Sequence, residues 1–259
     1  MKRLTLASFV LVAAMPCAVL AGSPQVIRFG VDPSFPPFES KAPDGSLVGF
    51  DIDLGKAICA DLHTKCEWVE QNFDGMIPGL KARKFDAVLS AMVATPARRE
   101  QIDFTNRLYA GPSRLVARAG ANLQPTADSL RGKRIGVEQG TSQETFARQE
   151  WAPAGAQILP YQDQQQVYAD LMNGRLDATF QPVVQADLGF LKTPRGKGFA
   201  FAGAEVKDRR VSGDGVAIGI RKNDHELASK INQAISNIRK SGEYDRIDRK
   251  YFDFDIYGE

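Results

Sequence analysis

Residues 80–91 read LKARKFDAVLSA, and residues 171–182 read LMNGRLDATFQP. Each segment passes from a helix end through a short turn into Asp-Ala and a strand-forming run. A second matched pair, IRFGV at 27–31 and KRIGV at 133–137, lies upstream of them. We therefore predict two similar α/β units with mostly parallel sheets; the alternative is a chance likeness between common α/β patterns.

The repeat also indicates where a ligand binds. In open α/β sheets, ligands bind beyond the carboxyl ends of the parallel strands. If those ends face each other in the two units, a shared cleft is the expected site.

The segments around the first repeat have patterns that fit this arrangement. Strands are expected at 26–31, 66–70 and 85–90, and helices from residues 50 and 73. Apolar residues of the first helix recur every three to four positions, at Ile52, Leu54, Ala57, Ile58 and Leu62.

The N-terminal residues 1–21 are typical of a secretory signal peptide. They carry Lys2 and Arg3, no acidic residue, an apolar stretch and a small residue, Ala21, at the end. Export to the periplasm is therefore expected.

Composition narrows the class of protein. The chain has 259 residues, of which 43% are hydrophobic and 25% charged, as in folded globular proteins. Loss of Lys2 and Arg3 with the signal peptide reduces the 33 basic residues to the number of the acidic ones, 31. A formally neutral chain argues against nucleic acid as a partner, because phosphate-backbone binding needs an excess of basic residues.

Two cysteines of the exported chain lie close in sequence. Cys59 falls in the last turn of the first expected helix, and Cys66 opens the following strand. In an oxidising compartment such a pair usually forms a disulfide, although two buried thiols are the alternative. With only two histidines and no Cys/His cluster, we expect no zinc site and no other cofactor.

Five motifs together resemble a known family. They are FPPF at 35–38, VGFDIDL at 48–54, FDGMIP at 73–78, TPAR at 95–98, and a C-terminal segment running from GEY at 242–244 to YF at 251–252. They resemble the periplasmic amino-acid-binding proteins of ABC importers. ICADLHTKCEW at 58–68, GFLK at 189–192 and FDFDIYG at 252–258 are similar to the branch that binds lysine, arginine and ornithine or histidine.

The resemblance implies a two-lobed "Venus flytrap" fold with a two-strand hinge. Lobe one would comprise residues 22–109 plus 216–259, lobe two residues 114–206, and the hinge crossings residues 110–113 and 207–215. The protein would be a monomer that delivers a small molecule to an inner-membrane ABC permease. A periplasmic sensor that presents its ligand to a membrane receptor would have the same sequence features.

The site for a ligand carboxylate is expected at TPAR. Thr95 is a suitable N-cap and Pro96 a suitable first helical residue, so Arg98 lies one turn into a helix. The family places an arginine here against the ligand α-carboxylate; the alternative is a surface arginine. By the same resemblance, Thr141, Ser142 and Gln143 of lobe two meet this carboxylate through N–H or hydroxyl groups.

Residues for the ligand side chain also follow from the resemblance. Phe35 and Phe73 would sandwich its stem between two aromatic faces. Asp32 would accept from the distal cation, with Ser90 and Asp51 beside it. Each of these could instead be a core or turn residue.

Three positions depart from the family pattern. The α-ammonium is held in the family by two hydroxyls and an aspartate, but these positions are Ala91, Val93 and Pro182 here. None of the three side chains can accept a hydrogen bond, and burying an unpaired ammonium costs several kcal/mol.

Two explanations of this departure are open. Glu138, where the branch usually has an apolar residue, could replace the lost aspartate. Alternatively, the ligand lacks a free primary α-amine, as an opine or a guanidino acid does. The ligand class is therefore cationic amino acids or their derivatives, and a periplasmic dehydratase with Glu138 as general acid is the enzymatic alternative to a non-enzymatic binding protein.

Overall fold

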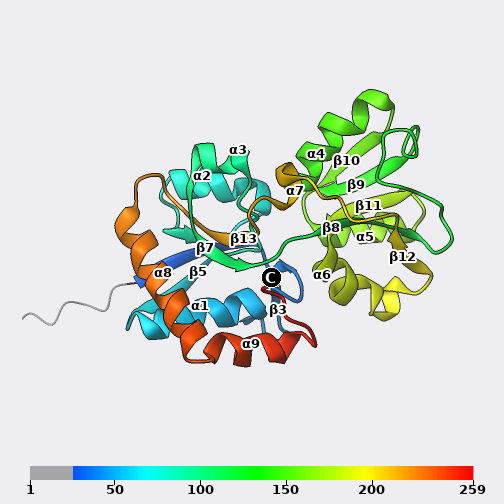
Figure 1. The fold of residues 1–259 in the computed structure, drawn as a ribbon. Helices are drawn as coiled ribbons and strands as arrows, with labels where there is room; N and C mark the ends of the chain where they lie inside the picture. Colours follow the sequence, from blue (N-terminus) through cyan, green and yellow to red (C-terminus); the bar gives the residue numbers. More distant parts are fainter. Residues whose placement is uncertain (1–25, 259) are drawn as a thin grey trace, which may run out of the picture.

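Two five-stranded sheets form the centres of two lobes (Figure 1). In this computed structural model, residues 26–258 are described, and the expected signal peptide at 1–21 lies outside them. The first lobe is built on the strand order β5 (Lys65–Glu70), β1 (Val26–Val31), β6 (Ala87–Val88), β13 (Val216–Ile220), β7 (Asp103–Tyr109). The second is built on β10 (Gln157–Tyr161), β9 (Arg134–Glu138), β11 (Ala178–Pro182), β8 (Ser113–Arg118), β12 (Phe199–Ala202).

The repeat found in the sequence has the same structural role in both lobes. β1 pairs with β6 in parallel, and β9 pairs with β11 in parallel. In the first lobe, Arg28 of β1 donates its backbone N–H and its guanidinium to Asp86, which directly precedes β6. In the second lobe, Arg134 of β9 donates the same two groups to Asp177, which directly precedes β11. The repeated aspartate thus ties the amino end of one parallel strand to its neighbour, and the predicted pair of α/β units is confirmed.

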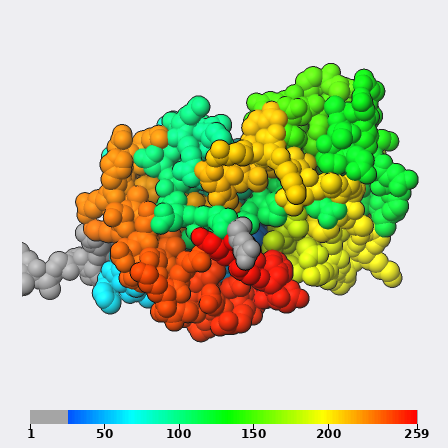
Figure 2. Space-filling view, viewed as in Figure 1, coloured from blue at the N-terminus to red at the C-terminus, as the bar shows by residue number. Residues whose placement is uncertain are grey.

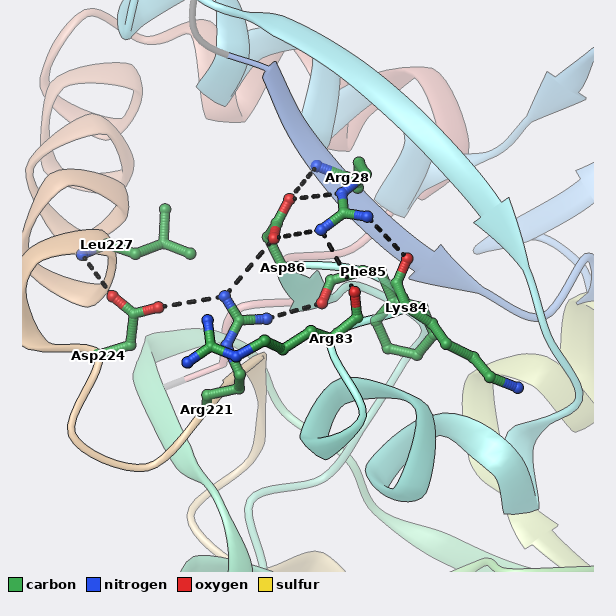
Figure 3. A network of polar contacts seen from close by, with 8 residues as sticks. All are labelled: Arg28, Arg83, Lys84, Phe85, Asp86, Arg221, Asp224 and Leu227. Atoms are coloured by element: carbon green, nitrogen blue, oxygen red, sulfur yellow. Dashed lines mark hydrogen bonds and ion pairs between the residues drawn. The ribbon is translucent and has the colours of Figure 1, made fainter.

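In the first lobe this tie is part of a larger polar network (Figure 3). Asp86 also accepts from Arg221, which follows β13 and donates to the Phe85 carbonyl at 2.7 Å. Asp224 joins Arg221 to the start of the next helix by accepting from the Leu227 N–H. The network secures the amino end of β6, so that the strand's carboxyl end is held in place for the site.

Helices cover both faces of each sheet. In the first lobe, α1 (Phe50–Asp61), α8 (His225–Lys240) and α9 (Glu243–Tyr251) share one apolar core, and α2 (Met76–Lys81) packs into a second with Ile102, which directly follows α3 (Pro96–Gln101). In the second lobe, α4 (Ser142–Glu150) and α5 (Gln164–Met172) lie in separate cores. The remaining short elements are β2 (Ser34–Phe35), β3 (Glu39–Lys41), β4 (Leu47–Val48), α6 (Val183–Ala186), α7 (Arg209–Ser212), η1 (Phe73–Gly75), η2 (Ala152–Ala154), η3 (Asp187–Leu191) and η4 (Pro194–Gly196).

The chain passes between the two sheets twice. The first passage joins β7 to β8, and the second joins β12 to β13 through α7. In the space-filling view, the gold segment that contains α7 lies across the junction of the lobes (Figure 2). α7 packs against α3 of the first lobe and α4 of the second.

Two local predictions can be compared with the elements found. The strand expected at 85–90 is shorter, because only Ala87 and Val88 pair with neighbouring strands. The predicted disulfide joins Cys59 in α1 to Cys66 in β5, and so fixes the first helix to an edge strand of its sheet. None of the helices within residues 26–258 is both long and apolar enough to cross a lipid bilayer.

Candidate functional site

A cavity lies between the two lobes, at the carboxyl ends of β1, β6, β9 and β11. Its wall includes every residue that the sequence placed in the ligand site except Asp51. Lobe one contributes Asp32, Phe35, Phe73, Ser90, Ala91, Val93 and Arg98, and lobe two contributes Glu138, Thr141, Ser142, Gln143 and Pro182. Four lining residues were not predicted: Glu39, Gln164, Phe180 and Gln181.

The helix that carries Arg98 begins as expected. The Thr95 hydroxyl caps α3 by accepting from the Arg98 N–H at 3.3 Å, and Pro96 is the first helical residue. This local structure turns the Arg98 side chain inward, where it is only 8% exposed.

The Arg98 guanidinium is buried without a carboxylate partner. Its Nη1 donates to the Val93 carbonyl at 2.9 Å and its Nη2 to the Gly140 carbonyl at 3.1 Å, while the guanidinium lies 5.2 Å from the centre of the Phe73 ring. Burial lowers the pKa of Arg98 to about 10, so the group stays charged at neutral pH. No ion pair to it forms among residues 26–258, so the buried charge of Arg98 has no counter-ion within the described chain.

The start of α4 faces Arg98 from the second lobe. Thr141 caps this helix by accepting from the Glu144 N–H at 3.1 Å, and its hydroxyl donates to the Glu138 carbonyl at 2.6 Å. The Glu144 carboxylate in turn accepts from the Gly140 N–H at 2.8 Å. In the usual capping box the donor is the N–H of the N-cap residue, which here would be Thr141.

The side chains of the next two residues are also used within the protein. Ser142 Oγ donates to the Val211 carbonyl at 2.9 Å, and Gln143 Nε2 donates to Ser113 Oγ at 2.8 Å. The first N–H groups of a helix have no acceptor inside it. What α4 offers to a ligand is therefore its backbone N–H groups rather than its hydroxyls.

Carboxyl groups gather around Asp32, which directly follows β1. Asp32 accepts from Ser34 N and Oγ at 3.2 and 2.7 Å and from Phe73 N at 2.9 Å, and its own N–H donates to Ser90 Oγ. Ser90 in turn donates to Glu39 Oε1 at 2.8 Å. Burial raises the pKa of Asp32, because its hydrogen bonds only partly compensate for lost hydration.

Glu138, at the end of β9, brings a carboxyl from the opposite lobe. It is 4% exposed, and its carboxyl forms no hydrogen bond or ion pair with any residue between 26 and 258. Burial, and next the charge of Asp32, raise the pKa of Glu138 well above its usual value. Glu138 and Asp32 line the same cavity, and the negative charge of Asp32 disfavours ionisation of Glu138.

Asp51 lies behind the cavity wall, where it acts as a support. Its Oδ2 accepts from the Ala91 N–H and its Oδ1 from the Tyr109 hydroxyl, both at 2.8 Å. Ala91 has a left-handed φ of 47°, which is unfavourable for a residue with a Cβ. The Asp51 bond holds that conformation, and burial raises the pKa of Asp51 to about 7.

The two predicted aromatic residues lie in different surroundings. Phe35 is buried and stacks on Phe38, with 6.0 Å between ring centres. Phe73 lies under the Arg98 guanidinium and places one aromatic face on the cavity.

The residues missed by sequence reasoning had weak signals. Glu39 lies in a three-residue strand, is fully buried, and has an Oε2 without a partner in the described chain. Gln164 begins α5 inside a polar run that suggests an exposed turn. Phe180 precedes Pro182 by two residues in β11, so strand alternation from Pro182 could have identified it, whereas the same alternation places Gln181 on the opposite face.

Residues 27–254 match the family of bacterial extracellular solute-binding proteins, family 3. The chain belongs to this family. Among its relatives, the histidine-binding periplasmic protein of Escherichia coli K12 is 49% identical over 259 residues, covering all of both chains. The lysine/arginine/ornithine-binding periplasmic protein of the same strain is 46% identical over 260 residues, again covering both chains entirely.

Solved structures of this family have the same two-lobed α/β fold. An arginine-specific periplasmic binding protein of Salmonella typhimurium superimposes with a TM-score of 0.80 at 31% identity. The match covers 88% of this chain and 99% of that one. The predicted family and fold class are thus confirmed, and the relatives at hand are binding proteins.

Proposed function

We propose that the protein is the periplasmic solute-binding subunit of an ABC importer, and that its ligand is a cationic amino acid or a derivative of one. The observation that carries this proposal is the charge pattern of the cavity. An unpaired buried Arg98 offers a site for a carboxylate, whereas Asp32 and Glu138 offer a site for a cation. The names of the relatives support the same ligand class and location.

Binding would be coupled to closure of the lobes about the crossings at 110–113 and 207–215. Two hydrogen bonds already join the lobes, from Arg98 to the Gly140 carbonyl and from Gln165 to the Ser34 carbonyl at 3.1 Å. A ligand that touches both lobes stabilises this closed form, and the closed surface is what a permease would recognise.

An enzymatic role has one observation in its favour. The raised pKa of Glu138 favours its protonated form, which is the form that a dehydratase on this fold requires of a general acid. Incubation with a cyclic acid substrate and product analysis tests this alternative. We favour binding without catalysis, because the two Escherichia coli relatives are binding proteins and no metal cluster is present in residues 26–258.

The proposal is tested by a thermal-shift screen of basic amino acids, opines and guanidino acids. A ligand at a hundred times its dissociation constant adds about 2.7 kcal/mol to the free energy of unfolding. Failure of all these ligands to raise the melting temperature would contradict the proposal. Loss of uptake of the ligand in a deletion strain then distinguishes an importer subunit from a sensor.

A further inference from the structure

The part of the cavity beside Arg98 is apolar. Ala91, Val93 and Pro182 line the main cavity and also a second, adjoining cavity. The second cavity is otherwise lined mainly by apolar side chains such as Phe35, Val184 and Val216. A carboxylate on Arg98 would therefore place its neighbouring carbon against an apolar wall.

Two polar groups beside this wall are already bonded. The Val93 carbonyl accepts from Arg98 Nη1 at 2.9 Å and from Thr95 N at 3.0 Å. The hydroxyl of Tyr109, a residue that lines the second cavity, donates to Asp51. The side chains of Ala91, Val93 and Pro182 offer no acceptor to an ammonium group next to the ligand carboxylate, and an unpaired buried cation is unfavourable.

The cavity also contains polar groups that have no partner in the part of the chain that the structure describes. The Glu138 carboxyl of lobe two is unpartnered in the described chain and lines the same cavity as Asp32 of lobe one, so acidic groups from both lobes border it. Gln181 Nε2, on the neighbouring strand β11, is buried and also lacks a partner within residues 26–258. Two carboxyls from opposite sides fit a cation with several N–H donors, such as a guanidinium.

We propose, building on the function above, that the ligand carries a carboxylate and a terminal cation but no ammonium on the carbon next to the carboxylate. The carboxylate binds Arg98 and the terminal cation lies between Asp32 and Glu138. The apolar wall accepts the uncharged carbon chain and has room for a small uncharged substituent. An opine fits poorly, because its second carboxylate needs a second cation and Arg98 is the only cationic side chain that lines either cavity in the described chain.

The test compares matched ligand pairs by isothermal titration calorimetry on the wild-type protein. The pairs are arginine and 5-guanidinopentanoate, lysine and 6-aminohexanoate, and histidine and imidazolepropionate, which differ only in the α-amino group. In the pair that binds, the form without the amine should bind about tenfold tighter or more. Agmatine, which keeps the guanidinium but lacks the carboxylate, should bind far more weakly than 5-guanidinopentanoate.

Two failures can be told apart. If an amino acid binds as tightly as its deaminated partner, this inference is wrong and the proposed function stands. If no member of any pair binds, the proposed function fails with it.

A variant tests the position of the wall. Pro182→Asp adds an acceptor where the two cavities meet, so the preference for the deaminated ligand should fall by about tenfold. Pro160→Asp is the control, because Pro160 is an exposed residue in the same sheet and lines neither cavity. An unchanged preference in a folded Pro182→Asp variant would refute the assignment, and the ligand pairs on wild type decide the matter if the variant does not fold.

Discussion

In the proposed binding mode, Arg98 is the residue on which binding of the ligand carboxylate depends. Arg98→Ala should weaken ligand binding by about 2 to 5 kcal/mol, because the ligand carboxylate would be buried without its partner. Calorimetry measures the change in dissociation constant. Arg99→Ala is the matched control: it lies in the same helix, but is half exposed and pairs with Asp214 at the surface. Equal losses of affinity in the two variants would contradict the role of Arg98.

Glu138 should couple ligand binding to proton release. Burial raises the pKa of Glu138 well above its usual value, whereas a bound cation favours its ionised form and so lowers that pKa. Binding therefore releases a proton when Glu138 is protonated beforehand, and affinity for cationic ligands should rise as the pH increases toward the raised pKa. Titration in buffers with different ionisation enthalpies detects this proton. Glu138→Gln should abolish the release, and an unaltered proton count in that variant would assign the proton to another group.

Single residues show what the sequence could and could not predict. The places of Arg98 and Thr141 could be predicted from the sequence, because helix caps and first turns have local sequence patterns. Both helices begin where these patterns predict. No such local pattern determines where the Asp51 side chain lies. Whether a carboxyl at the start of α1 points into the cleft or toward Tyr109 depends on packing with a strand 58 residues away in the chain. Glu39 was missed because its burial is set by tertiary packing around a three-residue strand.

At the scale of elements, the repeated strands were predictable and the extent of pairing was not. The Arg–Asp tie explains why the same short pattern recurs: it fixes the parallel neighbour at the amino end of β6 and of β11. The length of β6 depends on how many of its residues find partners on both sides, which no local pattern encodes.

The disulfide between α1 and β5 should stabilise the first lobe without affecting the site. The double variant Cys59→Ala, Cys66→Ala should lower the free energy of unfolding by about 2 to 3 kcal/mol, since the cross-link restricts a short loop of the unfolded chain. Urea denaturation measures this loss, and calorimetry should show an unchanged ligand affinity. A large change in affinity would mean that the disulfide also positions the cavity wall.

The molecule as a whole is in a closed form. Besides the two hydrogen bonds between lobes, two glycines of the second lobe pack directly against the first. A Cβ on Gly140 would meet Asp74 Cα at 2.6 Å, and one on Gly189 would meet the Pro36 carbonyl oxygen at 2.6 Å. Closure thus depends on surfaces that leave no space for a methyl group.

Gly189→Ala should separate closure from folding. Gly189 lies in η3 with a backbone that does not require glycine, so the substitution obstructs the approach of Pro36 and not the fold of the second lobe. Ligand affinity should fall by about 1 to 3 kcal/mol, the usual cost of an overpacked contact, while the melting temperature without ligand stays the same. Small-angle scattering should show less compaction at a given ligand concentration. Gly196→Ala supplies the contrast, because its Cβ would meet the Phe190 carbonyl at 2.3 Å inside the same lobe and should reduce stability instead. Wild-type affinity in Gly189→Ala would show that tight binding does not require the lobes to meet at this point.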